Sequence, residues 1–269
     1  MTEPGLGPVT GDAAPLLERM TRLGFATKGT LTIIVGALAL RLALGQGGRL
    51  TGQSGAIRTL RDQPFGTVAL VVLAVGLWGY ALWMFVSAFM DPQGKGTRVV
   101  GVAERVSFFV TGIGYSVLAL GSLRLLLGRG GLGADLDHLV ASVLTPVFGR
   151  WLVGLVGIAV VTAGILQIRL GLTAGFRRSL RRDIAPWLRR ITIVSGRVGY
   201  AALGVLSLLV GASLTRGALQ YDPSEAGGWD EALGLLARLG EGRWVLAAAA
   251  SGLILYGVYF VLLARVRAL

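Results

Sequence analysis

One short pattern occurs three times along this chain, each time at the start of a long apolar segment. An arginine is followed three residues later by an aromatic residue and seven residues later by a glycine. The three copies are Arg22/Phe25/Gly29, Arg105/Phe108/Gly112 and Arg197/Tyr200/Gly204, spaced 83 and 92 residues apart. Such self-similarity indicates that one structural unit has been repeated, and a repeat constrains the architecture of a chain more strongly than any local feature.

Each copy of the pattern opens the first of two apolar segments. The chain is 54% hydrophobic and only 15% charged, and its mean hydropathy is +0.70. Six segments exceed the roughly 18 apolar residues that a spanning helix requires. They lie near 23–44, 66–90, 105–127, 147–170, 194–215 and 243–265. We therefore predict an all-α, polytopic membrane protein with six transmembrane helices.

Each repeat is predicted to contain a spanning helix, a loop with a short amphipathic helix, and a second spanning helix. The loop positions Ile57/Val140/Leu233 and Leu60/Val143/Leu236 align as pairs three residues apart, which lie on one helical face. Two spans return the chain to its starting side, so the repeats are parallel and related by an axis along the membrane normal. Three such repeats suggest a pseudo-threefold bundle, with a side-by-side row as the alternative.

The predicted organisation has five parts. They are a disordered tail over 1–17, repeat 1 over 18–91, repeat 2 over 92–170, a basic amphipathic inner segment over 171–193, and repeat 3 over 194–269.

The net charge of +12 is placed mainly on one side of the predicted membrane. With six spans, both termini and the loops near 91–104 and 171–193 share a side, and that side carries more of the lysine and arginine residues. The positive-inside rule then predicts that both termini are cytoplasmic. A basic face beside an anionic leaflet favours anionic phospholipids as partners and makes nucleic acid an unlikely alternative.

The repeated stretches resemble a bacterial family of three tandem two-helix repeats, the domain-of-unknown-function 1206 family. The resemblance rests on Arg22–Gly29 (RLGFATKG), Ala56–Leu60 (AIRTL) with Gln63–Gly66 (QPFG), and Arg197–Gly204 (RVGYAALG). It covers roughly residues 18–265. The second copy diverges, because Ser107 stands where the others have Gly24 and Gly199. The resemblance implies an integral, multi-pass protein of the bacterial inner membrane and supplies no catalytic residues.

The motif cations Arg22, Arg105 and Arg197 allow two interpretations. Arginine, aromatic residue and glycine share one helical face. The three arginines could converge on one anion or lipid headgroup. Alternatively, each arginine anchors a helix at the inner interface, the aromatic residue belongs to the interfacial belt, and the glycine permits close helix packing. The anion site requires all three guanidinium groups to approach a common point.

Lys28 is the one clear cation more than a turn inside a predicted span. Twelve uncharged residues separate it from Arg41, and about 18 Å of helix is too short to cross the bilayer core. The ammonium must therefore snorkel to the interface or face the bundle interior, and an intramembrane charge is a functional hypothesis by default. The repeat equivalents Thr111 and Leu203 exclude a symmetric ring of lysines.

Glycine and alanine are frequent on the predicted fourth and sixth spans. We interpret these faces as packing surfaces within the chain, with a homo-oligomer interface as the alternative. The residues are Gly149, Gly154, Gly157, Ala159, Ala163 and Gly164 on the fourth span, and Gly252 and Gly257 on the sixth.

The segment from Phe176 to Arg190 is the most basic part of the chain. Phe176, Leu180 and Ile184 are spaced four residues apart, which predicts a basic amphipathic helix, interrupted or restarted at Pro186, that lies in an anionic leaflet. A topology determinant without a separate task is the alternative. The predicted headgroup contacts are Arg177, Arg178, Arg181, Arg182, Arg189 and Arg190.

No catalytic, metal or cofactor site is predicted. The chain has no cysteine and one histidine, His138, so a zinc or haem site is not expected. No carboxylate or proline lies inside the predicted spans, which counts against a coupled transporter. We expect a non-enzymatic scaffold or anionic-lipid-interacting protein. The alternative is a channel or carrier for a small solute along the repeat axis, and a homo-oligomer or larger membrane complex stays open.

Overall fold

The computed structural model describes residues 13–46, 53–90, 99–129, 147–181, 184–220, 233 and 242–266. Over these ranges the chain is helical and has no β-strand, and six of its helices are long and apolar enough to cross a membrane. The all-α, six-span prediction is confirmed. The spanning helices are α1 (Ala13–Ala43), α3 (Gly66–Phe89), α4 (Val99–Leu126), α6 (Val147–Thr173), α7 (Pro186–Gln220) and α9 (Gly242–Val266).

Several helices extend beyond the apolar segments that predicted them. α7 begins at Pro186 rather than near residue 194, at the position where proline is favoured because the first helical N–H has no intrahelical partner. α1 begins at Ala13, inside the tail predicted over 1–17, whereas residues 1–12 lie outside the described residues. Hydropathy locates the apolar middle of a helix, but backbone hydrogen bonding continues into polar turns at either end.

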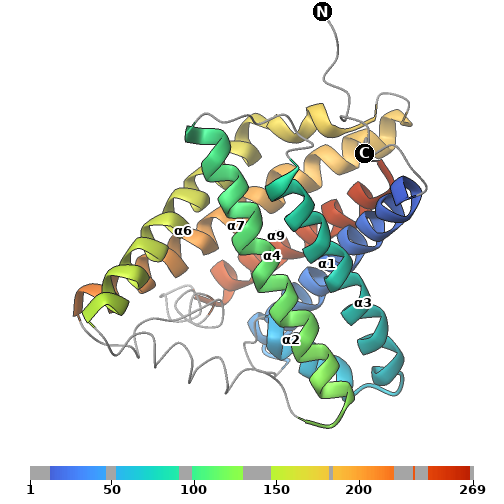
Figure 1. The fold of residues 1–269 in the computed structure, drawn as a ribbon, viewed down its shortest axis with the longest axis horizontal. Coiled ribbons are helices and arrows are strands. Elements are labelled where there is room, and N and C mark those ends of the chain that lie inside the picture. Colours follow the sequence, from blue (N-terminus) through green and yellow to red (C-terminus); the bar gives the residue numbers. More distant parts are fainter. Residues whose placement is uncertain are drawn as a thin grey trace, which may run out of the picture.

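The second helix of each repeat packs most closely on the first helix of the next repeat. α3 packs on α4, α6 packs on α7, and α9 returns to pack on α1. Figure 1 shows α1 in blue beside α9 in red, and α6 beside α7 on the left of the view. The last helix of the chain therefore contacts the first, and the repeats interlock rather than forming a row of separate hairpins.

Packing within a repeat differs between the three copies. α1 packs on α3 and α7 packs on α9, but α4 and α6 are not among the closely packed pairs of described helices. Among the described helices, close contacts therefore run in the order α4, α3, α1, α9, α7, α6, with α4 and α6 at the two ends. Only 17% of the most apolar part of α4 and 11% of that of α6 is buried, against 33–56% in the other four spans.

The motif glycines mark the points where the interlocking helices cross. A Cβ added to Gly29 would lie 2.6 Å from the carbonyl oxygen of Gly257, and one added to Gly204 would lie 2.7 Å from that of Gly164. Each pair of backbones can approach this closely only because neither residue has a side chain. The prediction that these glycines pack within the chain is confirmed.

Further close contacts follow seven residues along each of these helices. Gly36 lies against the backbone of Ala250, and Gly211 against that of Gly157. In the α3–α4 pair, Gly112 instead faces the ring of Phe85. The first helix of each repeat thus packs on its partner helix through the same face. In the α3–α4 pair, this face meets a side chain rather than a backbone.

The short helix predicted in the first loop is present as α2 (Gln53–Arg61). Its residues Ala56 and Ile57 are buried, and it packs on α1, α3 and α4. In the third loop, Leu233 is helical and fully buried, as its repeat equivalent Ile57 is. The remaining residues of the second and third amphipathic segments lie outside the described residues.

The segment over 176–190 does not form one continuous basic amphipathic helix, whereas the predicted restart at Pro186 is confirmed, because α7 begins at that residue. A short 3₁₀-helix, η1 (Gly175–Ser179), follows Ala174, whose φ of 51° is left-handed. Leu180 is extended, and the Arg181 amide donates to the carbonyl of Val266 at the end of α9, at 3.0 Å. The physical reason is tertiary burial: Phe176 and Leu180 are both buried, which fixes a compact segment in place of an exposed helix.

Candidate functional site

The three motif arginines each bind the end of a different helix. Every one of them donates a hydrogen bond to backbone carbonyls in the last turn of the helix on which its own helix packs. The bonds join Arg22 to Ala264, Arg105 to Ala88 and Phe89, and Arg197 to Gly171 and Leu172, at 2.6–3.4 Å.

Ala88, Gly171 and Ala264 occupy equivalent positions in the three repeats. The last carbonyls of a helix have no intrahelical donor and carry partial negative charge, so a guanidinium group there satisfies both needs. The three arginines therefore act on three separate helix ends. They do not form a ring around one ligand, and the common anion site is not supported.

The motif aromatic residue is part of the core in the first repeat. Phe25 is 2% exposed, and its ring centroid lies 5.7 Å from that of Tyr80 and 5.8 Å from that of Phe260. These contacts join α1 to α3 and α9. The interpretation of Phe25 as a belt residue at the membrane interface is therefore wrong.

Lys28 points into the bundle, where aromatic rings surround it. Its ammonium donates a hydrogen bond to the Tyr80 hydroxyl at 2.8 Å. The same nitrogen lies 4.2 Å from the ring centroid of Phe260, 4.7 Å from Tyr80, 5.4 Å from Tyr115 and 5.8 Å from Tyr256. These four residues, which we call the Lys28 cage, are buried and come from α3, α4 and α9.

The cage compensates the charge of Lys28 without a carboxylate. In the described spanning helices, the only carboxylates are those of Glu18 and Glu104, and both lie within two turns of a helix start. Ring faces attract a cation by about 0.5–2 kcal/mol each, more when the cation is desolvated. Lys28 itself is only partly buried, so its side chain is not completely enclosed by the cage.

A second polar pair lies in the α6–α7 arm of the bundle. Ser207 donates a hydrogen bond to the Gln167 side-chain oxygen at 3.0 Å. By repeat equivalence, Ser207 corresponds to Tyr115 and Gln167 to Phe260, so the pair lies at the depth of the Lys28 cage. We did not identify Gln167 from sequence, although an amide inside an apolar span is a recognisable signal of interhelical bonding.

The amphipathic helix α2 contacts the cage from the loop side. Gln53, its first residue, lies beside the Tyr115 hydroxyl. Because α2 also packs on α1 and α3, it connects the first loop to the part of the bundle that holds Lys28.

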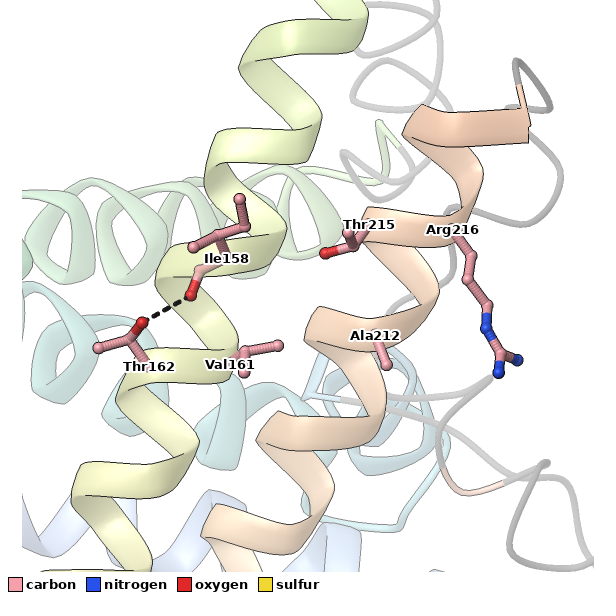
Figure 2. Close-up of a pocket in the computed structure, with 6 residues that line it drawn as sticks. All are labelled: Ile158, Val161, Thr162, Ala212, Thr215 and Arg216. Carbon is pink, nitrogen blue, oxygen red and sulfur yellow. Dashed lines mark hydrogen bonds between the residues drawn. The ribbon is translucent and has the colours of Figure 1, made fainter.

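A cavity of about 410 Å³ lies between α6 and α7 (Figure 2). Its threonine hydroxyls are already used, because Thr162 bonds the Ile158 carbonyl and Thr215 bonds the Gly211 carbonyl. Figure 2 shows the Arg216 guanidinium directed away from the other lining residues. The cavity therefore has a mainly apolar lining, and both of its threonine hydroxyls already donate to backbone carbonyls. It is lined by Ile158, Val161, Thr162, Ala212, Thr215 and Arg216.

The predicted headgroup arginines lie at the same end of the bundle as the motif arginines. Arg177, Arg181, Arg189 and Arg190 are exposed. Arg182 and the side chain of Arg178 lie outside the described part of the chain. His138 also lies outside it, and the described residues contain no group of three or more His, Cys, Asp or Glu side chains that could hold a metal ion.

Comparison with known proteins agrees with the repeat architecture. The Domain of Unknown Function (DUF1206) family model matches residues 23–91, 106–174 and 198–267, one segment in each repeat. The uncharacterized protein YxxB of Bacillus subtilis (strain 168) is 33% identical over 260 residues, which cover 96% of this chain and 94% of YxxB. No solved structure matches the chain. The chain belongs to the DUF1206 family, as a membrane-type helical protein of three tandem repeats.

Proposed function

We propose that this protein is a non-enzymatic scaffold of the bacterial inner membrane whose arginine-rich end binds anionic phospholipid headgroups. In this proposal both termini are cytoplasmic. The observation that carries it is the attachment of the arginine segment to the bundle. Phe176 and Leu180 are buried, while Arg177 and Arg181 on either side of Leu180 are exposed. Burial of the apolar residues thus holds the cations at the surface.

The start of α7 extends this basic surface. Arg189 and Arg190 are exposed, and Trp187 is 65% exposed. Tryptophan is enriched at the headgroup level of membranes, and each basic residue near an anionic surface contributes about 1 kcal/mol. We name Arg177, Arg181, Arg189 and Arg190 the basic face, and propose that it contacts phosphatidylglycerol or similar lipids.

The channel alternative has weaker support. A path along the repeat axis that used Lys28 would have to pass the Lys28 cage. There, Phe25, Tyr80, Tyr256 and Phe260 are all at most 5% exposed, and their rings contact one another. Within the described residues, this part of the bundle is filled by aromatic side chains.

Trp187 provides a test of the proposed lipid contact. The protein would be reconstituted in vesicles that contain brominated phosphatidylglycerol or brominated phosphatidylcholine at equal bromine content. The Trp187 signal is the difference in tryptophan fluorescence between the parent chain and the Trp187→Phe variant. We expect brominated phosphatidylglycerol to quench this signal more strongly, because the basic face enriches anionic lipid beside it.

Two quadruple variants complete the test. Replacing the four basic-face arginines with glutamine is expected to abolish the difference between the two lipids. The matched control replaces four exposed arginines at the opposite ends of the helices, Arg58, Arg61, Arg129 and Arg243, and should preserve it. Equal quenching by both lipids in the parent chain, or a preference that survives loss of the basic face, would contradict the proposal.

A further inference from the structure

The cavity between α6 and α7 lies along one side of their crossing. Its described lining consists of three residues from each helix, spaced i, i+3 and i+4, and such residues lie on one helical face. Ile158 is 57% exposed, and Thr162 and Ala212 are exposed as well. The cavity is therefore a groove that opens to the side of the bundle rather than an enclosed space.

The groove has an identifiable cause in the sequence. The repeat equivalent of the α6–α7 pair is the pair of α9 with α1. Thr162 stands where α9 has Leu255, and Thr215 stands where α1 has Leu40. Each threonine is smaller than the equivalent leucine, and its hydroxyl bonds a carbonyl of its own helix. The α6–α7 pair thus has less side-chain volume on this side of the crossing.

Arg216, at one end of the groove, belongs to a second arginine repeat. It lies 19 residues after the motif arginine Arg197. The same interval occurs in the other two repeats, between Arg22 and Arg41 and between Arg105 and Arg124. That interval corresponds to about 28 Å of helix, close to the roughly 30 Å thickness of the hydrocarbon core. Arg197 and Arg216 therefore lie at opposite membrane interfaces.

The groove combines an apolar lining with a positive charge at headgroup level. Ala212 lies one helical turn before Arg216, which places the rest of the lining in the hydrocarbon region. The Arg216 guanidinium is exposed and points away from the other lining residues (Figure 2). Neither α6 nor α7 contains an aspartate or glutamate, so the two helices supply no carboxylate to this arginine. A phospholipid has the matching arrangement, because its phosphate lies next to its acyl chains.

We propose that the groove between α6 and α7 binds one anionic phospholipid, with an acyl chain along the groove and the phosphate on Arg216. The groove volume of about 410 Å³ falls within the roughly 300–1,000 Å³ of small-molecule sites. A guanidinium group binds phosphate through paired N–H donors. The basic face includes the start of α7, whereas Arg216 is one turn from its last residue, Gln220. This lipid therefore lies in the other leaflet, and its site does not depend on the basic face.

Photoactivatable lipids test this proposal on the full-length protein. Phosphatidylglycerol and phosphatidylcholine, each with a diazirine on one acyl chain, would be compared at equal mole fraction in phosphatidylcholine nanodiscs. We expect saturable labelling of the groove residues by phosphatidylglycerol, up to one adduct per chain and about fivefold stronger than by phosphatidylcholine. Peptide mass spectrometry locates the adducts. Equal labelling by the two probes would overturn the anionic headgroup, and absent or non-saturating labelling would overturn the site.

Substitutions separate the two parts of the site. Arg216→Gln should lower labelling by phosphatidylglycerol about fivefold and leave labelling by phosphatidylcholine unchanged, while Arg216→Lys should retain most of the preference. Thr215→Leu, which introduces the leucine of α1, should fill the groove and weaken labelling by both probes. Arg41→Gln is the matched control. It removes the equivalent arginine beside Leu40 and Leu255, and should change neither signal.

Either test variant is decisive if the other fails to fold, as judged by melting temperature. Parent-like labelling in folded Thr215→Leu would contradict binding in the groove. A parent-like lipid preference in folded Arg216→Gln would contradict the phosphate contact, as would equal losses in Arg216→Gln and Arg41→Gln, which an arginine near any helix end predicts.

Two further measurements assign the occupant. The variant that lacks the four arginines of the basic face should be labelled in the groove as the parent is, so failure of the proposed function and failure of this site are distinguishable. A second copy of the chain is the competing occupant. The chain has no cysteine, so Ala212→Cys would form disulfide-linked dimers on oxidation if two grooves met, and that result would overturn the lipid assignment.

Discussion

Gly29→Ala is expected to lower the stability of the bundle by about 1–3 kcal/mol, as overpacking at a close contact does. The added methyl group would lie 2.6 Å from the Gly257 carbonyl oxygen and 2.8 Å from the Val261 amide nitrogen. Neither backbone atom can move without separating α1 from α9. Thermal unfolding in detergent, followed by size-exclusion chromatography of the surviving protein, measures the loss.

The same substitution at Gly114 is the matched control. Among the described residues, nothing lies within 4 Å of its added Cβ, and alanine is a better helix former than glycine by up to about 1 kcal/mol. Gly114→Ala should therefore leave stability unchanged or raise it. Gly204→Ala should resemble Gly29→Ala, whereas Gly112→Ala should cost less, because its nearest neighbour is the ring of Phe85. Equal shifts in melting temperature at Gly29 and Gly114 would contradict the close crossing.

Lys28→Glu is the substitution for which we expect the largest loss of stability. It places an anion against the ring faces of Phe260, Tyr80, Tyr115 and Tyr256, which carry negative charge density and attract cations. An uncompensated buried charge costs on the order of 3–5 kcal/mol. The expected result is loss of monodisperse protein on extraction, or a strongly lowered melting temperature.

Lys28→Met is the matched neutral change at this position. It loses the hydrogen bond to Tyr80 and the cation–π contacts, but it also removes a charge from an apolar interior. These effects oppose each other, so the melting temperature should stay close to that of the parent chain. A parent-like melting temperature for Lys28→Glu would show that the side chain reaches water rather than the cage.

Repetition and hydropathy predicted most of the fold. The six spans follow from apolar length, and the three parallel units follow from the spacing of the arginine, aromatic and glycine residues. The packing role of Gly157 and Gly164 was also evident, because small residues on one face of an apolar helix indicate close contact. These features are local, or repeat at a fixed spacing, and one sequence is enough to recognise them.

The pairing of helices was not predictable in the same way. A glycine at position 29 identifies a face for close packing but not its partner, which is Gly257, far along the chain. The sequence shows that Ser107 departs from the glycine of the other two repeats. Its effect on packing also depends on Ala163, which stands where the other repeats have Tyr80 and Tyr256. The helix predicted after Phe176 failed because periodicity cannot show that this ring is buried against Tyr200 and Tyr259.

The central claim is that the first and last helices of the chain are neighbours, because α9 supplies Tyr256 and Phe260 to the cage around Lys28. The chain has no cysteine, so spin labels can be placed without background substitutions. Arg41→Cys and Arg243→Cys lie at the loop ends of α1 and α9, and both sites are exposed. Their repeat equivalents on α4 and α3 are Arg124 and Thr67.

Electron–electron distance measurement on these two label pairs in nanodiscs is the most direct test. Helices α3 and α4 are consecutive in sequence, so the Thr67–Arg124 pair provides the reference for adjacent helices, whose axes lie about 8–10 Å apart. The contact between α1 and α9 predicts the same short distance distribution for Arg41 and Arg243. A distribution for Arg41 and Arg243 that is longer by several helix diameters would place α1 and α9 at opposite ends of a row and contradict the account.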